Sequence, residues 1–309
     1  MNLMTRRQAL AASSAALLQP AFSASASASA PAPAEADHPA LLALERRAGG
    51  RLGVAVLDTV SGAQTGLRRD ERFGMCSTFK LPLAGLVLKA VDEGRLALDQ
   101  WVPYGEADMV SHAPVTSLHL KAGGMTVGAL AEATHVTSDN PAANLLVALL
   151  GGPAAVTASL RALGDAHTRL DRLEPTMNRV PDGELRDTTT PAAMACTTAR
   201  LLRSDWLSPA SHERLAGWMV ATQTGRKRLR AGLPAAWRAG DKTGTAMHPS
   251  MADKLNDVAI AWPDAQQAVV IAAYYDAPGR SGRMRDEDQA VLAEVGRIAA
   301  AWWQALPRR

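Results

Sequence analysis

Residues 74–88 read GMCSTFKLPLAGLVL, and the rest of the chain is organised around them. Two polar groups, the hydroxyl of Ser77 and the amine of Lys80, open this otherwise apolar stretch. Residues i and i+3 share one face of a helix, so the two side chains would meet near its amino end. There a buried lysine with a lowered pKa could take the proton of a serine nucleophile. A capping serine and a lysine that reaches solvent give the same pattern, and both interpretations stay open here.

The composition excludes several classes of protein. The chain has 309 residues, of which 47% are hydrophobic, enough for a sizeable core in one large domain or two lobes. No stretch reaches the roughly 18 consecutive apolar residues that a membrane-spanning helix needs. The one clear basic run, residues 226–230, has neither a nucleic-acid motif nor neighbouring aromatic residues for base stacking. We therefore expect no nucleic-acid partner and, after processing, no membrane.

The cysteines and histidines predict no disulfide scaffold and no metal. Cys76 and Cys196 are the only cysteines, and two free thiols are the simpler interpretation. The seven histidines are scattered without metal-ligand spacing, so we expect no metal and no other cofactor. No Gly-x-Ser-x-Gly surrounds Ser77, which disfavours an α/β-hydrolase.

The first thirty residues differ from everything that follows. Arg6 and Arg7 precede a mildly apolar stretch and then alternating Ser and Ala, a pattern typical of an export signal. We predict a signal at residues 1–30, a Pro/Ala linker at 31–37 and a single domain at 38–309, located in the periplasm. The paired arginines favour the twin-arginine route, and a general secretory signal is the alternative.

The order of predicted elements is helix, two strands, many helices, three strands and a helix. The predicted helices are 39–48, 77–93, 126–135, 141–150, 153–163, two that start at Pro191 and Pro209, and 286–306; the predicted strands are 51–58, 64–68, 237–245, 255–262 and 266–275. Pro82 should kink its helix or lie in the first turns.

This order predicts an α+β fold. One antiparallel sheet would form from both ends of the chain, with flanking N- and C-terminal helices and an inserted all-α lobe. We assign residues 38–76 and 222–309 to the α/β lobe and 77–221 to the helical lobe. The cleft between the lobes is the expected site.

Residues 137–140, Thr-Ser-Asp-Asn, stand just before the proline of a predicted helix. In an extended loop, residues i and i+2 point the same way, so Ser138 and Asn140 would face the cleft and Asp139 the protein interior. Simple helix capping is the alternative interpretation.

Lys242 lies on the first predicted strand after the helices, followed by Gly244. A lysine on an inner strand is costly to bury unless it serves a negative partner, and the glycine would let a ligand approach the backbone. A surface lysine next to a turn glycine is the alternative.

Residues 172–187 match the upper size of an Ω-loop, whose neck an Arg172–Asp187 ion pair would close. Glu174 and Asn178, at i and i+4, would share one face of a helical turn and hold a water molecule. A polar, solvated loop is the alternative.

Together these segments resemble the class A serine β-lactamases over about residues 41–306. Four motifs occur in the order and at the spacings of that family, namely Ser77-Thr78-Phe79-Lys80, Ser138-Asp139-Asn140, Glu174 with Asn178, and Lys242-Thr243-Gly244. The resemblance implies a β-lactamase/penicillin-binding transpeptidase-like fold. It also implies hydrolysis of penicillins and cephalosporins, with antibiotic resistance as the result, by what we expect to be a monomer.

The resemblance implies a covalent mechanism. Ser77 would attack the ring carbonyl after losing its proton to Lys80 or, through water, to Glu174, a choice that stays open. The N–H groups of Ser77 and Thr245 would form the oxyanion hole. Ser138 would pass a proton to the leaving nitrogen, and Glu174 would activate the water that frees the enzyme.

The remaining matched residues would bind substrate. Asn140 would hold the substrate's side-chain amide, and Lys242, Thr243 and Thr245 would bind its carboxylate beside Gly244. Asn178 would assist the hydrolytic water.

Two positions depart from the family's usual residues. Lys254 and Leu255 stand where many members place a carboxylate-binding arginine, so we assign that role to Arg228, which matches an arginine of other members. His112 stands where the family usually has Tyr or Trp, and we predict that it contacts substrate at the cleft mouth.

A third departure concerns the cysteine before the nucleophile. In similar carbapenem-hydrolysing members, the equivalent of Cys76 pairs with a second cysteine, and that position is Ala246 here. We predict no such disulfide. The segment 245–255 is also longer than usual, which would extend the hairpin beside the cleft.

Two other functions share part of this pattern. A penicillin-binding D,D-peptidase has the serine, the lysine and the Lys-Thr-Gly, and a β-lactam sensor would acylate once and hold the adduct. Glu174 in an Ω-loop argues against both, since it would supply fast deacylation.

Overall fold

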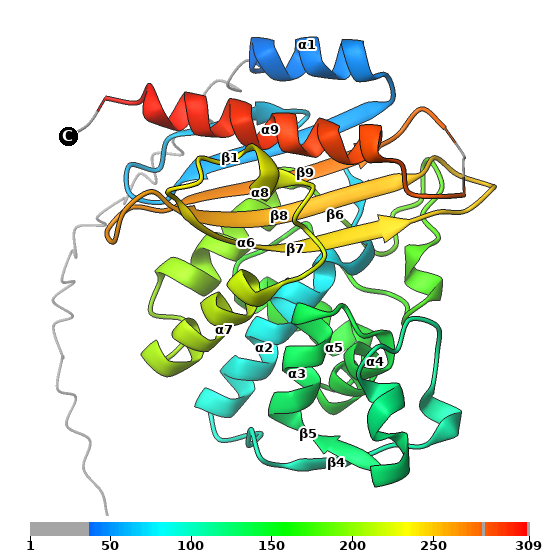
Figure 1. Ribbon diagram of the computed structural model, residues 1–309. Coiled ribbons are helices and arrows are strands. Elements are labelled where there is room, and N and C mark those ends of the chain that lie inside the picture. The colour runs from blue at the N-terminus through cyan, green and yellow to red at the C-terminus, as the bar shows by residue number, and fades with distance from the viewer. Residues whose placement is uncertain (1–36, 280–281, 308–309) are drawn as a thin grey trace, which may run out of the picture. The chain divides into compact units, whose positions relative to one another are not determined.

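A five-stranded antiparallel sheet joins the two ends of the chain (Figure 1). The computed structural model describes residues 37–279 and 282–307. The strands are β1 (Arg51–Asp58), β2 (Gln64–Leu67), β7 (Arg238–Ala246), β8 (Lys254–Trp262) and β9 (Val269–Asp276), in the order β2-β1-β9-β8-β7. Val54 of β1 lies opposite Ala273 of β9, so the first strand pairs with the last. The predicted α+β fold is confirmed.

Two terminal helices cover one face of the sheet. Helices α1 (Pro39–Ala48) and α9 (Asp286–Gln304) lie side by side over this face, and the short helix α8 (Leu229–Gly232) packs against α9. Their apolar side chains form one buried cluster with the strands, which includes Leu41, Leu292 and Ile271.

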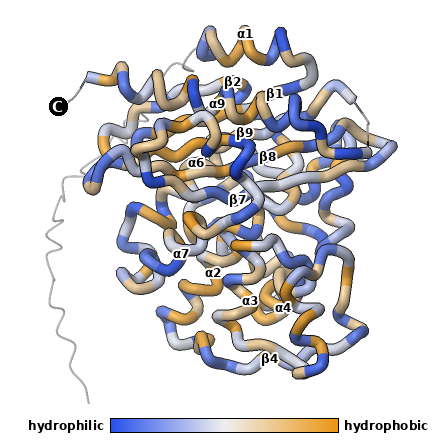
Figure 2. The backbone as a smooth tube through the Cα atoms, in the orientation of Figure 1, coloured by the Kyte–Doolittle hydropathy of each residue, from blue (hydrophilic) through white to orange (hydrophobic). Residues whose placement is uncertain are grey.

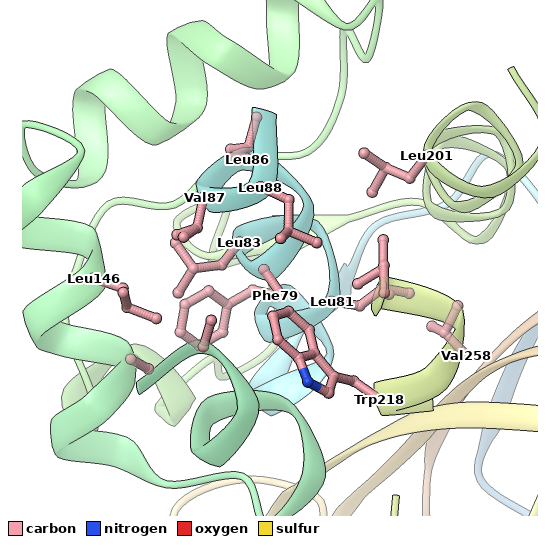
Figure 3. Close-up of a cluster of buried hydrophobic side chains, with 14 of the residues drawn as sticks. Phe79, Leu81, Leu83, Leu86, Val87, Leu88, Leu146, Leu201, Trp218 and Val258 are labelled. Carbon is pink, nitrogen blue, oxygen red and sulfur yellow. The ribbon is translucent and has the colours of Figure 1, made fainter. Parts of the chain in front are cut away.

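Helix α2 (Lys80–Asp92) forms the centre of the other layer, beneath the opposite face of the sheet. The helices around it are α3 (Val127–Val136), α4 (Asn140–Leu149), α5 (Pro153–Ala162), α6 (Pro191–Arg203) and α7 (Pro209–Ala221). Figure 3 shows Phe79, Leu83 and Leu146 gathered in the core around α2. Hydrophobic residues concentrate in the sheet and in these inner helices (Figure 2).

Helices α3, α4, α6 and α7 each begin directly after a residue whose side chain caps the helix. A side-chain oxygen accepts a hydrogen bond from a backbone N–H three residues later, which satisfies a donor with no partner inside the helix. The capping residues are Thr126 for α3, Asp139 for α4, Thr190 for α6 and Ser208 for α7. A proline follows within two residues in the last three, where its missing N–H costs little.

The α-helix that was predicted to start at Ser77 starts at Lys80 instead. Residues Cys76–Phe79 form the 3₁₀ turn η1, and the α-helix starts only at Lys80. Pro82 is therefore the third helical residue, where no intrahelical partner exists for its missing N–H. Of the two predicted outcomes, confinement to the first turn is the one observed.

Several short elements escaped prediction because two or three residues give no periodicity. Strand β3 (Phe73–Gly74) pairs with β6 (Thr188–Thr189), and β4 (Trp101–Pro103) pairs with β5 (Gly124–Thr126). The 3₁₀ turns are η2 (Glu106–Asp108), η3 (Thr116–Ala122) and η4 (Thr176–Asn178). The inserted helical segment thus contains a small strand pair, β4–β5, that an all-α lobe would lack.

The predicted export signal, residues 1–30, and nearly all of the predicted linker lie outside the described residues. Within the described part of the chain, no single helix is long and apolar enough to cross a bilayer, and α4 with α5, bent by 72°, meets that criterion only as a pair.

Candidate active site

Ser77 lies in a turn that packs directly against β7. Ser77 belongs to η1, and the preceding Cys76 has a left-handed φ of +46°. The side-chain amide of Asn256 donates to the Met75 carbonyl at 3.1 Å, which ties the turn to β8. A Cβ added at Gly244 would lie 2.7 Å from the Met75 carbonyl oxygen. Gly244 thus lets the strand approach the turn that carries Ser77, rather than only making room for a ligand.

The side chains of Ser77 and Lys80 both contact the same oxygen of the Glu174 carboxylate. Ser77 Oγ donates to Glu174 Oε1 at 3.2 Å, and Lys80 Nζ lies 3.1 Å from the same atom. The side chains of Lys80 and Glu174 are both fully buried. The sequence predicted that Ser77 and Lys80 would meet directly on one helix. In the structure both side chains contact Glu174 Oε1, which links them.

Lys80 has three further acceptor contacts besides Glu174. Its Nζ donates to the Ser138 carbonyl at 2.8 Å, to Asn140 Oδ1 at 2.5 Å and, weakly, to Ser138 Oγ at 3.4 Å. Burial lowers the pKa of Lys80, and the Glu174 carboxylate opposes that shift. The amine therefore depends on Glu174 to remain charged in an apolar environment.

Ser138 stands between two lysines. Its Oγ lies 3.1 Å from Lys242 Nζ and 3.4 Å from Lys80 Nζ. Asp139 turns the other way and is fully buried, where it caps α4 and accepts from the Thr116 amide at 2.9 Å. The predicted directions of the two side chains are therefore observed. The backbone reason differs, because Ser138 is left-handed with φ +64° rather than extended.

Asn140 and His112 are held by neighbouring backbone. Asn140 Nδ2 donates to the Ser111 carbonyl at 2.8 Å, while its Oδ1 accepts from Lys80. The His112 carbonyl accepts from the Asn140 amide at 3.0 Å. The His112 ring is exposed, and its Nε2 lies 3.1 Å from the Thr137 carbonyl oxygen. These contacts fix the loop in front of Ser138.

Lys242 projects from β7 toward Ser138 and is fully buried. Its Nζ also donates to the Thr243 carbonyl at 2.9 Å. Burial, and then the neighbouring Lys80 ammonium, lower the pKa of Lys242 to about 7. An anion bound here would restore the favourable partner that this lysine lacks.

Arg228 is buried against strands β7 and β8. It is 2% exposed, and its Nη1 donates to the carbonyls of Gly244 at 2.9 Å and Asn256 at 2.8 Å. Its Nη2 donates to Thr245 Oγ1 at 2.6 Å. Arg228 therefore reaches the predicted carboxylate site through the Thr245 hydroxyl. The hydroxyl oxygen of Thr243, on the same strand, lies 2.6 Å from the hydroxyl oxygen of Thr224.

Two buried carboxyl groups lie near Arg228. Burial and the neighbouring charge of Asp241 raise the pKa of Asp257 well above its usual value. Asp241 keeps an ion pair with Arg230, with Nε and Oδ1 2.7 Å apart. The Leu229 amide donates to Asp257 Oδ2 at 3.1 Å. The pair thus anchors the segment that carries Arg228.

The Ω-loop, residues 172–187, is closed by polar contacts at its neck. Arg172 Nε lies 2.5 Å from Asp187 Oδ2, the predicted ion pair. Asp187 is fully buried and also accepts from the backbone amides of Asp171 at 2.7 Å and Arg172 at 3.0 Å. Buried charge is tolerated here because hydrogen bonds satisfy it.

Asn144 fixes the backbone of Glu174 and was not singled out by sequence reasoning. Its Nδ2 donates to the Glu174 carbonyl at 2.9 Å, and its Oδ1 accepts the Glu174 amide at 2.9 Å. The available signal was its position four residues after Asn140, which places both on one face of α4. Asn256 and Thr224 were also missed, and each lies outside the four motifs.

Asn178 binds Glu174 directly. Its Nδ2 donates to Glu174 Oε2 at 2.5 Å. Its Oδ1 is buried and has no hydrogen-bond partner among the described residues. An unpaired buried acceptor is costly, and a small donor bound beside Glu174 would satisfy it.

The chain matches the model of the β-lactamase enzyme family over residues 38–303. It belongs to this family. The L2 β-lactamase of Stenotrophomonas maltophilia is 50% identical over 258 residues, which cover 83% of this chain and 82% of that protein. The CTX-M-8 β-lactamase of Citrobacter amalonaticus is 41% identical, with 82% and 86% covered.

Solved structures place the chain in class A. An ancestral class A β-lactamase reconstructed for Gram-negative bacteria superimposes with a TM-score of 0.80 at 53% identity, covering 85% of this chain and 98% of the other. L2 in complex with relebactam gives a TM-score of 0.79 at 50% identity, with 85% and 95% covered. The chain is a hydrolase of this class.

The cysteines of this class A β-lactamase are both free. Cys76 is fully buried against Ala246 and Met251, and burial raises the pKa of its thiol to about 12. A thiol with that pKa does not act as a nucleophile at neutral pH. Within residues 37–279 and 282–307, no group of three or more His, Cys, Asp or Glu side chains is arranged to hold a metal ion.

Proposed function

We propose that this chain hydrolyses penicillins and cephalosporins through an acyl-enzyme on Ser77. The observation that carries the proposal is the convergence of Ser77 Oγ and Lys80 Nζ on Glu174 Oε1, at 3.2 and 3.1 Å. A hydroxyl, an amine and a carboxylate in mutual contact supply a nucleophile and two groups able to move its proton.

In the acylation step, Ser77 Oγ attacks the β-lactam carbonyl while its proton moves to Glu174 Oε1 across their hydrogen bond. The Ser77 and Thr245 amides stabilise the oxyanion, a contact worth roughly 3–4 kcal/mol of barrier for one donor. The ring C–N bond then breaks. Ser138 Oγ, which lies between Lys80 and Lys242, delivers its proton to the departing nitrogen and takes one from Lys80 Nζ. Lys80 regains a proton from Glu174 Oε1, so Glu174 is a carboxylate again before deacylation.

In the deacylation step, Glu174 takes a proton from water as the water oxygen attacks the ester carbon. The C–O bond to Ser77 breaks, and Ser77 Oγ takes back the proton that Glu174 received from water, across their hydrogen bond, which leaves Glu174 a carboxylate. The unpaired Oδ1 of Asn178 is available to hold that water beside the carboxylate. General-base help of this kind contributes roughly 10²–10⁴ in rate.

Substrate binding falls to residues on both sides of the nucleophile. Lys242, Thr243 and Thr245 bind the substrate carboxylate, and the buried position of Arg228 supports a positioning role through the Thr245 hydroxyl. Asn140 binds the side-chain amide, beside His112 at the mouth of the cleft.

The variant Glu174→Ala tests the mechanism. In this variant Lys80 can still accept the Ser77 proton during acylation. Loss of the Glu174 carboxylate removes a charge that raises the pKa of Lys80, so the amine more readily becomes neutral. Deacylation has no such second proton acceptor. We therefore expect a long-lived adduct on Ser77, seen as a mass increase equal to the penicillin added.

Ser77→Ala, which should show no mass increase, is the control for that experiment. If the Glu174→Ala protein carried no added mass at steady state, the proposed role of Glu174 in deacylation would be wrong. A chromogenic cephalosporin, added to the unaltered protein, tests whether the chain is an enzyme or a β-lactam sensor. Sustained colour change supports the enzyme, and a single stoichiometric burst supports the sensor.

We further propose that residues 1–30 direct a monomeric enzyme to the periplasm by the twin-arginine route, where it protects the cell from β-lactams. Replacing Arg6 and Arg7 together by lysine should retain the activity inside the cytoplasm. Unchanged periplasmic activity would favour the general secretory route.

A further inference from the structure

Met284 lies against Arg228, the residue that supports the proposed carboxylate site. Arg228 Nη2 donates to Met284 Sδ at 3.3 Å and to Thr245 Oγ1 at 2.6 Å. One nitrogen therefore joins a methionine sulfur to a hydroxyl that we assign to substrate binding. A thioether is a weak acceptor, so the contact with Met284 is the weaker of the two.

Met284 is also open to solvent. Among residues 37–279 and 282–307 it is the one exposed methionine, with a fractional exposure of 53%. Met109 and Met247 are half-buried, and the other methionines of these two ranges are buried. Oxidation requires that the oxidant reach the sulfur, so Met284 should react before the other methionines.

The sulfur and the guanidinium belong to anchored segments. Arg285, the residue after Met284, forms a bidentate ion pair with Asp288 of α9, in which Nε and Nη2 each lie 2.6 Å from a carboxylate oxygen. Arg228 is buried, and its Nη1 donates to two strand carbonyls at 2.9 and 2.8 Å. A change at the sulfur therefore acts on a guanidinium that is already held in place.

Oxidation by hydrogen peroxide converts this weak acceptor into a strong one. A lone pair of Met284 Sδ attacks one peroxide oxygen, the O–O bond breaks, and the other oxygen leaves as water. The sulfur is oxidised to a sulfoxide and the peroxide is reduced. A hydrogen bond from nitrogen to the new oxygen takes about 2.9 Å, and the S–O bond adds to that length. The present separation of 3.3 Å cannot hold both in line, so Arg228 Nη2 must shift relative to the sulfur.

We propose that Met284 is an oxidation site that controls the carboxylate site through Arg228. The sulfoxide oxygen draws Nη2 away from Thr245 Oγ1, and the Thr245 hydroxyl loses the donor that orients it. The proposal rests on the proposed function, since it takes Thr245 as a ligand of the substrate carboxylate. Loss of one such hydrogen bond corresponds to a fall of about two- to tenfold in kcat/KM.

The test treats the unaltered enzyme with dilute hydrogen peroxide and compares penicillin hydrolysis before and after. Peptide mass spectrometry should place one added oxygen on Met284. The value of kcat/KM should fall about two- to tenfold, mainly through KM, and methionine sulfoxide reductase should restore it. Met284→Gln, whose side-chain carbonyl is a strong acceptor, should show the lower value without peroxide.

Three variants serve as controls. Met284→Leu should keep its own kcat/KM in peroxide, because leucine has no sulfur. Met247→Leu removes a half-buried methionine of the hairpin between β7 and β8, and this variant should remain as sensitive to peroxide as the unaltered enzyme. In Thr245→Val the hydroxyl is absent, so peroxide should lower kcat/KM no further, whereas general damage to the structure would still lower it.

Three results would overturn the proposal: no added oxygen on Met284, an oxidised Met284 with unchanged kcat/KM, or an equal loss of activity in Met284→Leu. An unaltered enzyme that turns over no penicillin before peroxide is added would instead overturn the proposed function.

Discussion

Helix α2 and the Ω-loop bring Lys80 and Glu174 to one shared contact, yet different forces hold the two segments. The helix is fixed by apolar burial, and Leu81, Leu83 and Leu88 are all fully buried in the core (Figure 3). The loop is fixed by polar contacts, namely the ion pair at its neck and the two hydrogen bonds from Asn144.

The difference teaches that stability and deacylation depend on different parts of the structure. Apolar packing resists local opening, whereas a loop held by a few hydrogen bonds can open without global unfolding. Damage to the core should therefore lower stability with little change in chemistry. Damage to the neck of the loop should slow deacylation with little change in stability.

The largest effect is expected from Leu88→Ala, near the end of α2 away from Lys80. Loss of a fully buried leucine should lower the free energy of unfolding by about 2–5 kcal/mol, with kcat unchanged per folded molecule. Urea unfolding and active-site titration measure the two quantities. Leu88→Met, which conserves volume, should cost less than about 1.5 kcal/mol. A large fall in kcat in Leu88→Ala would break the comparison.

Asp187→Ala should have an intermediate effect. It removes the ion pair with Arg172 and the acceptor for two backbone amides, so the loop should hold Glu174 less firmly. We expect the deacylation rate to fall roughly 10- to 100-fold, part of the general-base contribution. Acylation should fall less, because Lys80 remains in place. Pre-steady-state mass spectrometry separates the two rates.

Asp182→Ala is the matched control, since Asp182 is an exposed residue of the same loop. It should leave both rates unchanged. If Asp187→Ala and Asp182→Ala behaved alike, the polar neck would have no role in deacylation.

The smallest effect is expected at Lys242, which lies on β7 and belongs neither to the core around α2 nor to the Ω-loop. The effect is on the pH dependence of kcat/KM. The Lys242 pKa of about 7 means that the ammonium is present below pH 7 and is lost as the pH rises above it. Substrate affinity should therefore weaken on the alkaline side, with kcat/KM falling about fivefold between pH 7 and 8. Lys242→Arg should move this decline to higher pH, because arginine stays charged.

Arg228→Ala provides the comparison for Lys242. Its guanidinium does not titrate in this range, so its removal should lower kcat/KM at every pH without moving the midpoint. If kcat/KM declined over the same alkaline range in Lys242→Arg as in the unaltered enzyme, the titrating group would be a residue other than Lys242.

The sequence was most informative where local chemistry decides the structure. Thr190 and Ser208, each followed by a proline, predicted two helix starts because capping depends on only a few neighbouring residues. The four motifs likewise predicted which side chains gather around Ser77. Strands β3 and β6 escaped prediction, since tertiary contact and not periodicity creates them.

Long-range geometry was harder to predict. The position of Arg228 depends on carbonyls of two strands, and nothing near residue 228 in the sequence indicates them. The contact between Ser77 and Glu174 joins residues 97 apart in the chain, and the family resemblance predicted it where no local pattern could. Ser138 faces the site through a left-handed backbone, a conformation that its residue type does not suggest.

The pairing of β1 with β9 has a consequence for synthesis on the ribosome. Val54 finds its partner, Ala273, only after most of the chain has been made, so the sheet is completed late. A chain truncated before β9 would leave β1 and β8 with unpaired hydrogen-bonding edges, each a template for aggregation. Premature termination should therefore yield insoluble protein rather than a weakened enzyme.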